Sequence, residues 1–350
     1  MLCWTGELWF SLYKCNECNE TKHVAFSCKS RFCNSCGKPL SDLWMNKLIS
    51  WRPKHLKYYH LAFTIPEELR PFFKRHRKAL LTLPHTATET LFYFFGEKHK
   101  CKPWLLSVIH TFWAKLNRNP HVHVMVTSWG IKENGCYKAV DFIPYKGVLA
   151  SRKKGLLRQL RHRCKHNLEW QDLNSELYLL NKLYSQKSEN DSSQEKSWYI
   201  YFSKKANSFE IVLSYIGRYL KRPVISQSRI LAYNGDEVTF SYKDKKDWLT
   251  KIITTSALDF IGLLIQHIPN KFFKMVHYSG IFANRSKHKH LKIINMYFNN
   301  TQKTLSIPTN FRDRILAFTG KDPLLCSCGW CFHKYKMTIP WYPDIYFDSW

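Results

Sequence analysis

Acidic residues are scarce in this sequence. Its 350 residues include 26 Asp and Glu against 54 Lys and Arg, which gives a formal net charge of +28 when His is neutral. So large an excess of positive charge is typical of proteins that bind a polyanion such as a nucleic acid. The composition also excludes global disorder, because 45% of the residues are hydrophobic and can fill a substantial core.

Long apolar runs and a secretory leader are lacking as well. The strongest apolar run, residues 260–265, is far shorter than the ~18 residues of a membrane-spanning helix. The N-terminus has no basic region and reaches Glu7 before any apolar segment develops, unlike a signal peptide. We therefore expect no membrane association and a reducing compartment, in which the 12 cysteines serve as metal ligands and core thiols.

The expected secondary structure mixes strands and helices. Apolar patterns of period two predict strands, patterns of period 3.6 predict helices, and Asn234-Gly235 predicts a hairpin turn. Residues 185–197 contain no apolar side chain and are expected to form a polar loop. The expected strands are 59–65, 104–112, 121–128, 198–202, 228–233 and 238–242, and the expected helices are 67–83, 152–183, 208–220 and 248–270.

Two CxxC pairs near the N-terminus predict a zinc site. Cys15 and Cys18 are followed, after fourteen residues, by Cys33 and Cys36. This separation is close to that of zinc ribbons, in which four thiolates hold one Zn²⁺. Cys28 lies between the pairs and is an alternate ligand. A C-terminal cluster is a candidate for a second zinc site: Cys326, Cys328, Cys331 and His333.

A His-x-His pair could hold a second kind of metal. His121 and His123 belong to an apolar, strand-like segment, so both imidazoles are expected on one face of the strand and the intervening valines on the other. In a chain with 16 His, one such pair is expected by chance, so spacing alone does not decide between ligand and core histidine. His110, on the preceding expected strand, is the candidate third ligand or a hydrogen-bonded core residue.

Two tyrosines share one face of the helix expected over 208–220. Tyr215 and Tyr219 are four residues apart, although aromatics at this spacing are most often core residues. A basic segment follows, with Lys221 and Arg222. A tyrosine that attacks a phosphodiester requires a cation near the phosphate, because a phenol with a pKa near 10 is a poor nucleophile at neutral pH.

These separate signals, in this order, resemble one family. A Cys-rich zinc head, a His-x-His pair after Asn-Pro and a YxxxY helix are similar to transposases of the IS91 type, which are HUH single-strand nucleases with two tyrosines. The resemblance covers most of the chain, from Cys15 to about Gly320. It is most specific over 26–37, 60–66, 110–112, 119–124, 215–223 with 228–229, and 278–285.

The resemblance implies roles for these residues. Tyr215 and Tyr219 would cut and rejoin single-stranded DNA at transposon ends through a 5′-phosphotyrosine, in rolling-circle-like transposition. His121, His123 and His110 would hold Mg²⁺ or Mn²⁺, and Cys15, Cys18, Cys33 and Cys36 would hold structural Zn²⁺. DNA contacts are expected from Arg218, Lys221, Arg222 and Arg229. The expected location is the bacterial cytoplasm, at the nucleoid.

The implied fold class is α+β. We expect a zinc-ribbon-like module over 1–50, a nuclease domain with a mainly antiparallel sheet over 51–300, and a Cys-containing tail over 301–350. Basic segments such as Arg152 to Lys154 are expected to contact phosphates. Trp113, Trp129 and Tyr145 are candidates for stacking on unpaired bases, with core packing as the alternative for each.

Two alternatives stay open from the sequence. A plasmid relaxase or replication initiator could use the same His and Tyr residues. A decayed, non-catalytic zinc-dependent DNA-binding protein is the rival from another class. The fourteen residues before Cys15 are fewer than such transposases usually carry, so a shortened, inactive copy is part of that alternative. The sequence does not indicate an oligomeric state or a DNA target.

Overall fold

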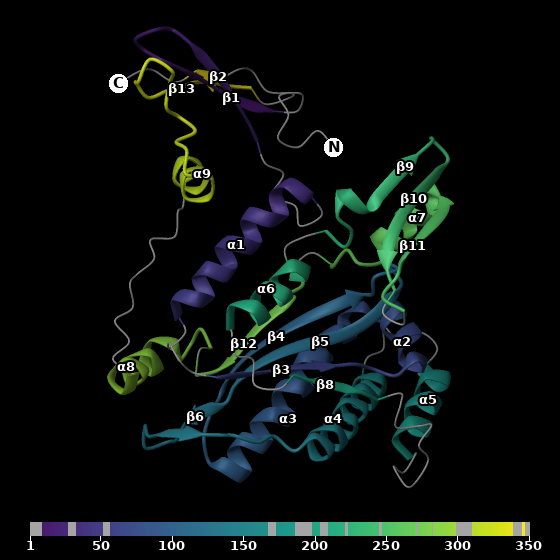
Figure 1. The fold of residues 1–350 in the computed structure, drawn as a ribbon. Coiled ribbons are helices and arrows are strands. Elements are labelled where there is room, and N and C mark those ends of the chain that lie inside the picture. The colour runs from purple at the N-terminus through teal and green to yellow at the C-terminus, as the bar shows by residue number, and fades with distance from the viewer. Residues whose placement is uncertain are drawn as a thin grey trace. The chain divides into compact units, whose positions relative to one another are not determined.

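The computed structural model describes residues 9–26, 33–51, 57–166, 173–185, 198–203, 209–220, 223–244, 247–270, 272–281, 283–298, 310–338 and 345–346 (Figure 1). The chain divides into two compact units. One combines Met1–Ser50, Lys221–Pro223 and Lys303–Trp350, and the other combines Trp51–Leu220 and Val224–Gln302. The segment that we expected as a separate C-terminal tail therefore belongs to the same unit as the N-terminus.

The larger unit is built around a five-stranded sheet. The strand order is β12-β4-β5-β3-β8, and every neighbouring pair is antiparallel. Helices and antiparallel strands in one unit confirm the predicted α+β class. The strands are β3 (Tyr58–Phe63), β4 (Trp104–Phe112), β5 (Arg118–Thr127), β8 (Ile200–Phe202) and β12 (Val276–Gly280).

One face of this sheet is the hydrophobic core. Val122, Val124 and Val126 of the central strand β5 are buried there against α3 (Thr82–His99) and α4 (Tyr145–His166). Each fully buried valine stabilises the fold by about 1.5–3 kcal/mol. Because side chains alternate along a strand, His121 and His123 must then face the other side of the sheet.

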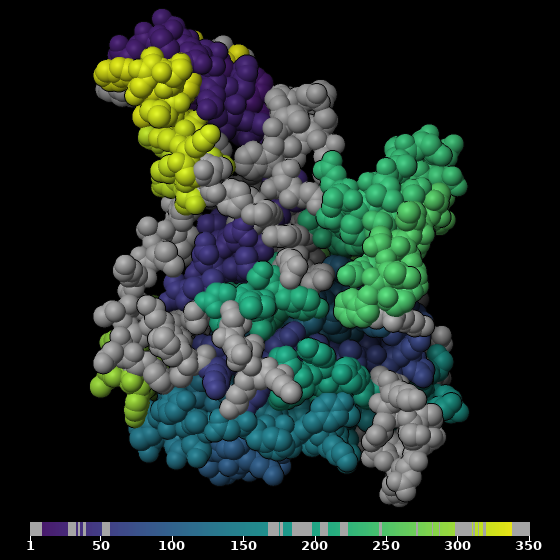
Figure 2. Space-filling model, in the orientation of Figure 1, coloured from purple at the N-terminus to yellow at the C-terminus, as the bar shows by residue number. Residues whose placement is uncertain are grey.

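The helix α6 (Phe209–Leu220) covers that other face. At its first residue, the buried ring of Phe209 packs on Tyr58 of β3, with ring centroids 4.7 Å apart, and on Trp104 of β4 at 5.9 Å. The opposite side of the helix is exposed at Ile211 and forms part of the surface seen in Figure 2. This apolar anchor fixes which side chains of α6 face the sheet.

A second, three-stranded sheet lies in the same unit. Its order is β11-β10-β9, with β9 (Ile230–Tyr233), β10 (Glu237–Lys243) and β11 (Thr250–Ser256). The helix α7 (Ala257–Ile265) packs Phe260 against Phe240 of β10. The remaining elements of this unit are α2 (Arg70–Arg75), β6 (Trp129–Ile131), β7 (Tyr137–Ala139), α5 (Leu173–Ser185) and α8 (Lys287–Phe298).

Two helix predictions are wrong in part. The segment 248–270 begins as β11, because its β-branched residues 252–255 pair with β10, and the helix begins only after Ser256, whose hydroxyl accepts a hydrogen bond from the Asp259 N–H. The segment 67–83 is not one helix. It consists of 3-10 turns at Glu67–Leu69 and Arg77–Leu81 on either side of α2, followed by α3.

One arginine expected on the surface is buried. Arg152 of α4 lies in the core, its guanidinium 5.6 Å from the centroid of the Phe63 ring. Burial lowers the pKa of Arg152 to about 9, and none of its guanidinium nitrogens has a hydrogen-bond partner within the described part of the chain. Arg152 therefore does not contact a DNA backbone.

The smaller unit joins both ends of the chain in one sheet. The strand order is β14-β13-β1-β2, so β1 near the N-terminus pairs with β13 near the C-terminus. The strands are β1 (Phe10–Lys14), β2 (Thr21–Ala25), β13 (His333–Thr338) and β14 (Ile345–Tyr346), and the helices are α1 (Asn34–Trp51) and α9 (Phe311–Thr319). No described helix of either unit combines the length and the apolar character needed to cross a membrane.

Gly280 offers a test of how β12 is held in the sheet. It ends β12 with φ +76°, and a Cβ on it would collide with the carbonyl oxygen of Pro103. We expect Gly280→Ala to lower the free energy of unfolding by at least about 2 kcal/mol, because backbone strain and a steric clash add. The control is Gly235→Ala, where φ is +106° but no atom lies within 4 Å of the added Cβ. Urea denaturation of both variants measures the difference, and equal losses would contradict it.

Candidate functional site

Three imidazoles meet on the face of the sheet that α6 covers. The register between β4 and β5 places His110 opposite His121 and Val108 opposite His123. One ring nitrogen from each of His110, His121 and His123 lies within 4.8 Å of the others. His110 and His123 are buried, and His121 is partly exposed. The third residue that the sequence nominated, His110, therefore lies close enough to the His-x-His pair to share a metal ion with it.

The chemistry of this triad fits a divalent cation. His121 Nδ1 lies 2.8 Å from the Asn119 carbonyl oxygen, to which its N–H donates, and such a bond fixes the ring orientation and tautomer of a metal-binding histidine. Three neutral imidazoles suit transition metals such as Mn²⁺ better than Mg²⁺, which prefers oxygen ligands. Solvent or a phosphate oxygen would have to supply further ligands on the exposed side of His121.

A fourth histidine supports the triad. His60 of β3 lies with its Nε2 2.8 Å from Nδ1 of His123, and the two rings are nearly parallel, with an interplanar angle of 14°. Burial lowers the pKa of His60 to about 4, so its ring is neutral near pH 7. Sequence reasoning did not assign His60 a role. The available signal was a polar residue within a strand whose residues are otherwise apolar or aromatic.

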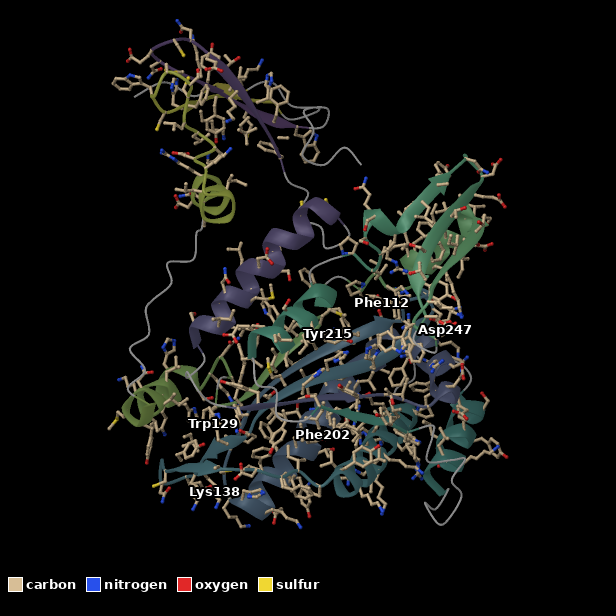
Figure 3. All side chains as sticks on the ribbon, viewed as in Figure 1. Phe112, Trp129, Lys138, Phe202, Tyr215 and Asp247 are labelled. Atoms are coloured by element: carbon tan, nitrogen blue, oxygen red, sulfur yellow. The ribbon has the colours of Figure 1, made fainter. Side chains whose placement is uncertain are left out.

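Tyr215 of α6 lies directly beside this cluster (Figure 3). The centroid of its ring is 5.5 Å from that of His123 and 5.9 Å from that of His60. Tyr215 is neither fully buried nor fully exposed. The structure thus brings together the first predicted tyrosine and the predicted histidines, although about ninety residues separate them in the chain.

The second predicted nucleophile and the predicted DNA-contacting residues differ in how far the structure describes them. Tyr219 and Arg218 belong to α6, but their side chains lie outside the described part of the structure, as do Lys221 and Arg222. Arg229 is described, and its guanidinium donates hydrogen bonds to the carbonyl oxygens of Ala114 at 2.6 Å and Ser241 at 2.7 Å. These bonds give Arg229 a structural role, because they connect it to the backbone of β10 at Ser241 and to that of Ala114.

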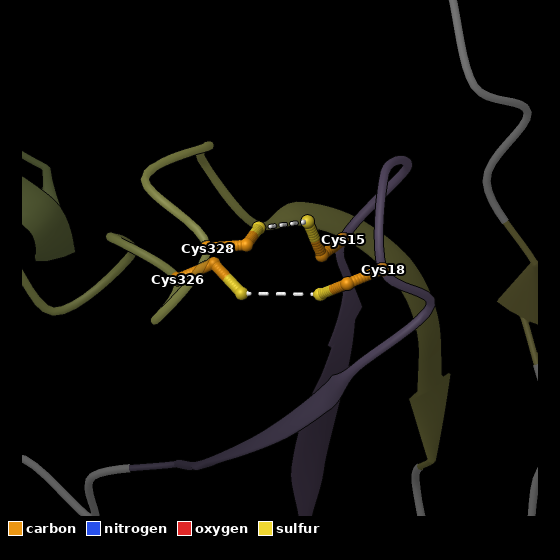
Figure 4. Close-up of side chains that lie close together, drawn as sticks. All are labelled: Cys15, Cys18, Cys326 and Cys328. Atoms are coloured by element: carbon orange, nitrogen blue, oxygen red, sulfur yellow. Dashed lines mark hydrogen bonds between the residues drawn. The ribbon is translucent and has the colours of Figure 1, made fainter.

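Four cysteines from opposite ends of the chain form a second cluster (Figure 4). The sulfurs of Cys15 and Cys328 are 3.5 Å apart, and those of Cys18 and Cys326 are 3.4 Å apart. Disulfide sulfurs would be about 2.05 Å apart, whereas four sulfurs at about 2.3 Å from one Zn²⁺ lie about 3.8 Å from each other. The four thiols therefore fit a tetrahedral zinc site.

The structure groups different cysteines from those that the spacing predicted. Among the described residues, Cys15 and Cys18 group with Cys326 and Cys328, not with Cys33 and Cys36, which are buried at the start of α1. The alternate ligand Cys28 lies outside the described residues. The CxxC spacing does not indicate this grouping, because it is the pairing of β1 with β13 that brings the C-terminal cysteines to the first CxxC pair.

The C-terminal cysteines do not form a separate metal group within the described ranges. Cys331 lies apart from the four-thiol cluster, and its sulfur accepts a hydrogen bond from Arg312 at 3.1 Å. Glu20 is the residue that sequence reasoning missed here. Its carboxylate accepts hydrogen bonds from the Cys326 thiol and the Ser327 hydroxyl, each at 3.0 Å, and so ties the two chain ends together.

Hydrogen bonds shift the acidity of two of these thiols in opposite directions. The backbone N–H of Cys18 lowers the pKa of Cys15 to about 7, which favours a thiolate. The Glu20 carboxylate raises the pKa of Cys326 to about 12, because it accepts a hydrogen bond from the protonated thiol. Metal binding by this cluster therefore requires the release of the Cys326 proton.

One of the predicted stacking residues is buried. Trp129 lies fully within the protein, so it does not stack on a base, whereas Trp113 and Tyr145 are partly exposed. The prediction treated all three alike because sequence does not separate a buried aromatic from an exposed one.

Comparisons with known proteins identify the family of this chain. A family model described as "Putative transposase" matches residues 105–290, and one described as "Transposase zinc-binding domain" matches residues 1–65. The transposase for insertion sequence element IS801 of Pseudomonas savastanoi pv. phaseolicola is 31% identical, over 94% of this chain and 80% of that protein. "Putative transposase y4qJ" of Sinorhizobium fredii is 25% identical, over 97% and 86%. No solved structure is a significant match.

The first family model spans the strands that carry the His triad and the helix that carries Tyr215, and the second spans the first half of the four-thiol cluster. These matches and the IS801 relative show that the chain is a transposase of the IS91 family with a zinc-binding domain.

Proposed function

We propose that this transposase cuts and rejoins single-stranded DNA at transposon ends, with Tyr215 and Tyr219 as nucleophiles, in rolling-circle-like transposition at the bacterial nucleoid. The observation that carries the proposal is the position of Tyr215. Its ring lies 5.5 Å from His123, beside three imidazoles whose ligand atoms are within 4.8 Å of one another. A nucleophile and a cation site thus share one face of the sheet.

The proposed reaction is a transesterification that exchanges one phosphodiester bond for another. The tyrosine oxygen attacks the scissile phosphorus, the bond from phosphorus to the 3′ oxygen breaks, and the phenol proton is lost while the 3′ oxygen gains one. The products are a 5′-phosphotyrosine and a free 3′-hydroxyl. Rejoining is the reverse attack by a 3′-hydroxyl, so no high-energy cofactor is required. A second tyrosine allows a second strand end to be held at the same time.

His110, His121 and His123 are proposed to hold Mn²⁺ or Mg²⁺. Such an ion would supply Lewis-acid polarisation of the scissile phosphate. His60 is proposed to set the orientation of His123. When the Nδ1–H of His123 donates a hydrogen bond to His60 Nε2, the other ring nitrogen of His123, Nε2, is unprotonated and can bind a metal ion. In this proposal the residues of 51–300 carry the chemistry.

The zinc of the zinc-binding domain is proposed to sit between Cys15, Cys18, Cys326 and Cys328. A metal there would crosslink β1 and the segment before β13, and would add folding free energy to a small unit. The zinc module is then composed of residues from both chain ends, not of residues 1–50 alone.

Covalent capture of DNA tests the nuclease proposal. Incubated with Mn²⁺ and a pool of labelled single-stranded oligonucleotides, the wild-type chain is expected to form an adduct that survives denaturing electrophoresis. Tyr215→Phe/Tyr219→Phe removes both nucleophiles, so its adduct is expected to fall to the metal-free background. Tyr93→Phe, on the exposed side of α3, is the matched control and is expected to retain the adduct.

Binding of the pool without any adduct would contradict the proposal and support a non-catalytic DNA-binding protein. Mass spectrometry of the adduct identifies the labelled tyrosine. A label on a tyrosine outside α6 would also refute the assignment.

The hydrogen bond between His60 and His123 has a measurable consequence. His60→Leu removes the acceptor for His123 Nδ1 and is expected to weaken Mn²⁺ binding about 10- to 100-fold. His60→Gln retains a carbonyl acceptor and is expected to recover part of that loss. Electron paramagnetic resonance of free Mn²⁺ during titration gives both affinities without DNA. Equal affinities for the Leu variant and the wild type, with unchanged circular dichroism, would exclude the supporting role.

Zinc content distinguishes the two ligand sets. We expect Cys326→Ser/Cys328→Ser to lose one equivalent of zinc per chain and to become sensitive to proteolysis within β1 and β2, because half of the site is missing. Cys136→Ser, an exposed cysteine outside the cluster, is the control and is expected to retain all zinc. Full zinc retention in the double variant, combined with loss in Cys33→Ser/Cys36→Ser, would restore the ligand set expected from spacing.

A further inference from the structure

Two exposed tyrosines stand next to the His cluster and have no part in the chemistry described above. Along the segment that enters β8, burial alternates strictly: Trp198 and Ile200 are 5% and 1% exposed, whereas Tyr199 and Tyr201 are 51% and 49% exposed. Trp198 and Ile200 belong to the hydrophobic core of the unit. By strand alternation, Tyr199 and Tyr201 share the face opposite to that core.

That face is the one that carries the His cluster. Tyr201 is opposite Ala62 in the β3–β8 register, and Ala62 is opposite His123 in the β3–β5 register. The ring centroid of Tyr201 is 6.1 Å from that of His60, which itself bonds to His123. Phe202, labelled in Figure 3, ends the strand. The two tyrosines therefore extend the face of the His cluster to the edge of the sheet.

From these positions we infer that Tyr199 and Tyr201 form a stacking platform for unpaired bases that flank the scissile phosphate. Each ring offers a half-exposed aromatic surface, and stacking on an aromatic side chain is available to every base regardless of sequence. The inference rests on the proposed function, because it takes the substrate to be the single strand that reaches the His cluster.

The spacing of the pair favours a single strand over a duplex. Residues two apart on a strand are about 7 Å apart, which is roughly twice the 3.4 Å between stacked bases along one DNA strand. Neighbouring bases can stack on the two rings only if they separate from each other. An unpaired strand allows this, whereas a duplex holds its bases stacked and paired.

The platform is held in place before DNA arrives. Thr64 fastens the segment at Tyr199: its N–H and its hydroxyl both donate to the Tyr199 carbonyl oxygen, at 3.0 and 2.7 Å, and its hydroxyl accepts from the Tyr199 N–H at 3.2 Å. After β8, the Ser203 N–H donates to the His60 carbonyl oxygen at 3.0 Å. A fixed backbone under two aromatic rings reduces the entropy lost on binding.

Equilibrium binding of an unstructured oligonucleotide tests the platform. The probe is a fluorescein-labelled oligothymidine of about 20 nucleotides, measured without a divalent cation so that no cutting occurs. We expect Tyr199→Ala and Tyr201→Ala each to weaken binding about 5- to 100-fold, and Tyr201→Phe to bind like the wild type, since it keeps the ring. The matched control is Tyr93→Ala, a 67% exposed tyrosine on α3, which covers the opposite face of the sheet.

An abasic probe separates stacking from other contacts. With an oligonucleotide that keeps the phosphates but lacks bases in its central part, the wild type and the two alanine variants are expected to bind equally. The dependence of binding on salt is expected to be the same for all variants, because phosphate contacts are unchanged. Unchanged affinity of both alanine variants for oligothymidine would overturn the inference, as would an equal loss with the abasic probe.

Measurement of adduct formation distinguishes failure of the stacking platform from failure of the proposed nuclease activity. If the alanine variants form adducts at the wild-type rate at every DNA concentration, the platform fails and the nuclease stands. If stacking is found but the wild type forms no adduct, the nuclease fails and the platform stands. Loss of the adduct in Tyr201→Phe would make Tyr201 a participant in the chemistry and would overturn its role as a platform.

Discussion

The pairing register of β4 and β5 is the constraint that determines which face of the sheet carries the His triad. Side chains alternate along β5, so the burial of Val122, Val124 and Val126 on one face is what places His121 and His123 on the other. A slip by one residue would place the imidazoles in the core and the valines under α6. The same core that stabilises the unit thereby selects the geometry of the His triad.

The end of this pairing is irregular beside the triad. The register shifts between His110 and Phe112, where β4 approaches the turn into β5. Such irregularities bend a strand and re-aim its side chains, and they are common next to active sites. His60 adds a further restraint from β3 through its bond to His123. Three adjacent strands thus contribute to one cluster of rings, and α6 closes it from above with Tyr215.

Sequence patterns predicted what is encoded locally. The His-x-His strand, the helix of Tyr215 and the Asn234-Gly235 turn are each specified within about ten residues, and all three elements are present. Contacts between distant segments were not predictable in this way. The partners of Cys15 and Cys18 lie more than 300 residues away, and the bond from His60 to His123 depends on sheet order. Residues 250–256 have a helix-like apolar pattern but are a strand because β10 offers a partner edge.

The net charge of +28 describes the chain as a whole and not the role of each arginine. Arg152 is in the core, and Arg229 binds two backbone carbonyl oxygens. Arg118 likewise donates to the carbonyl oxygens of Phe73 and Gln266, each at 2.7 Å. Arg118 and Arg229 therefore donate hydrogen bonds to carbonyl oxygens of the protein's own backbone. A count of basic residues overstates the number that face a nucleic acid.

The four-thiol cluster also sets an order of events during synthesis. Its sulfurs come from residues 308 and 313 positions apart. A ribosome that adds about 5–20 residues per second needs roughly 15–60 s to travel that distance. During most of this interval the first two cysteines and the hairpin of β1 and β2 are outside the ribosome without their partners. The smaller unit therefore matures last, after the strands and helices of the larger unit have been made. A ribosome that stops early releases a chain that never completes it.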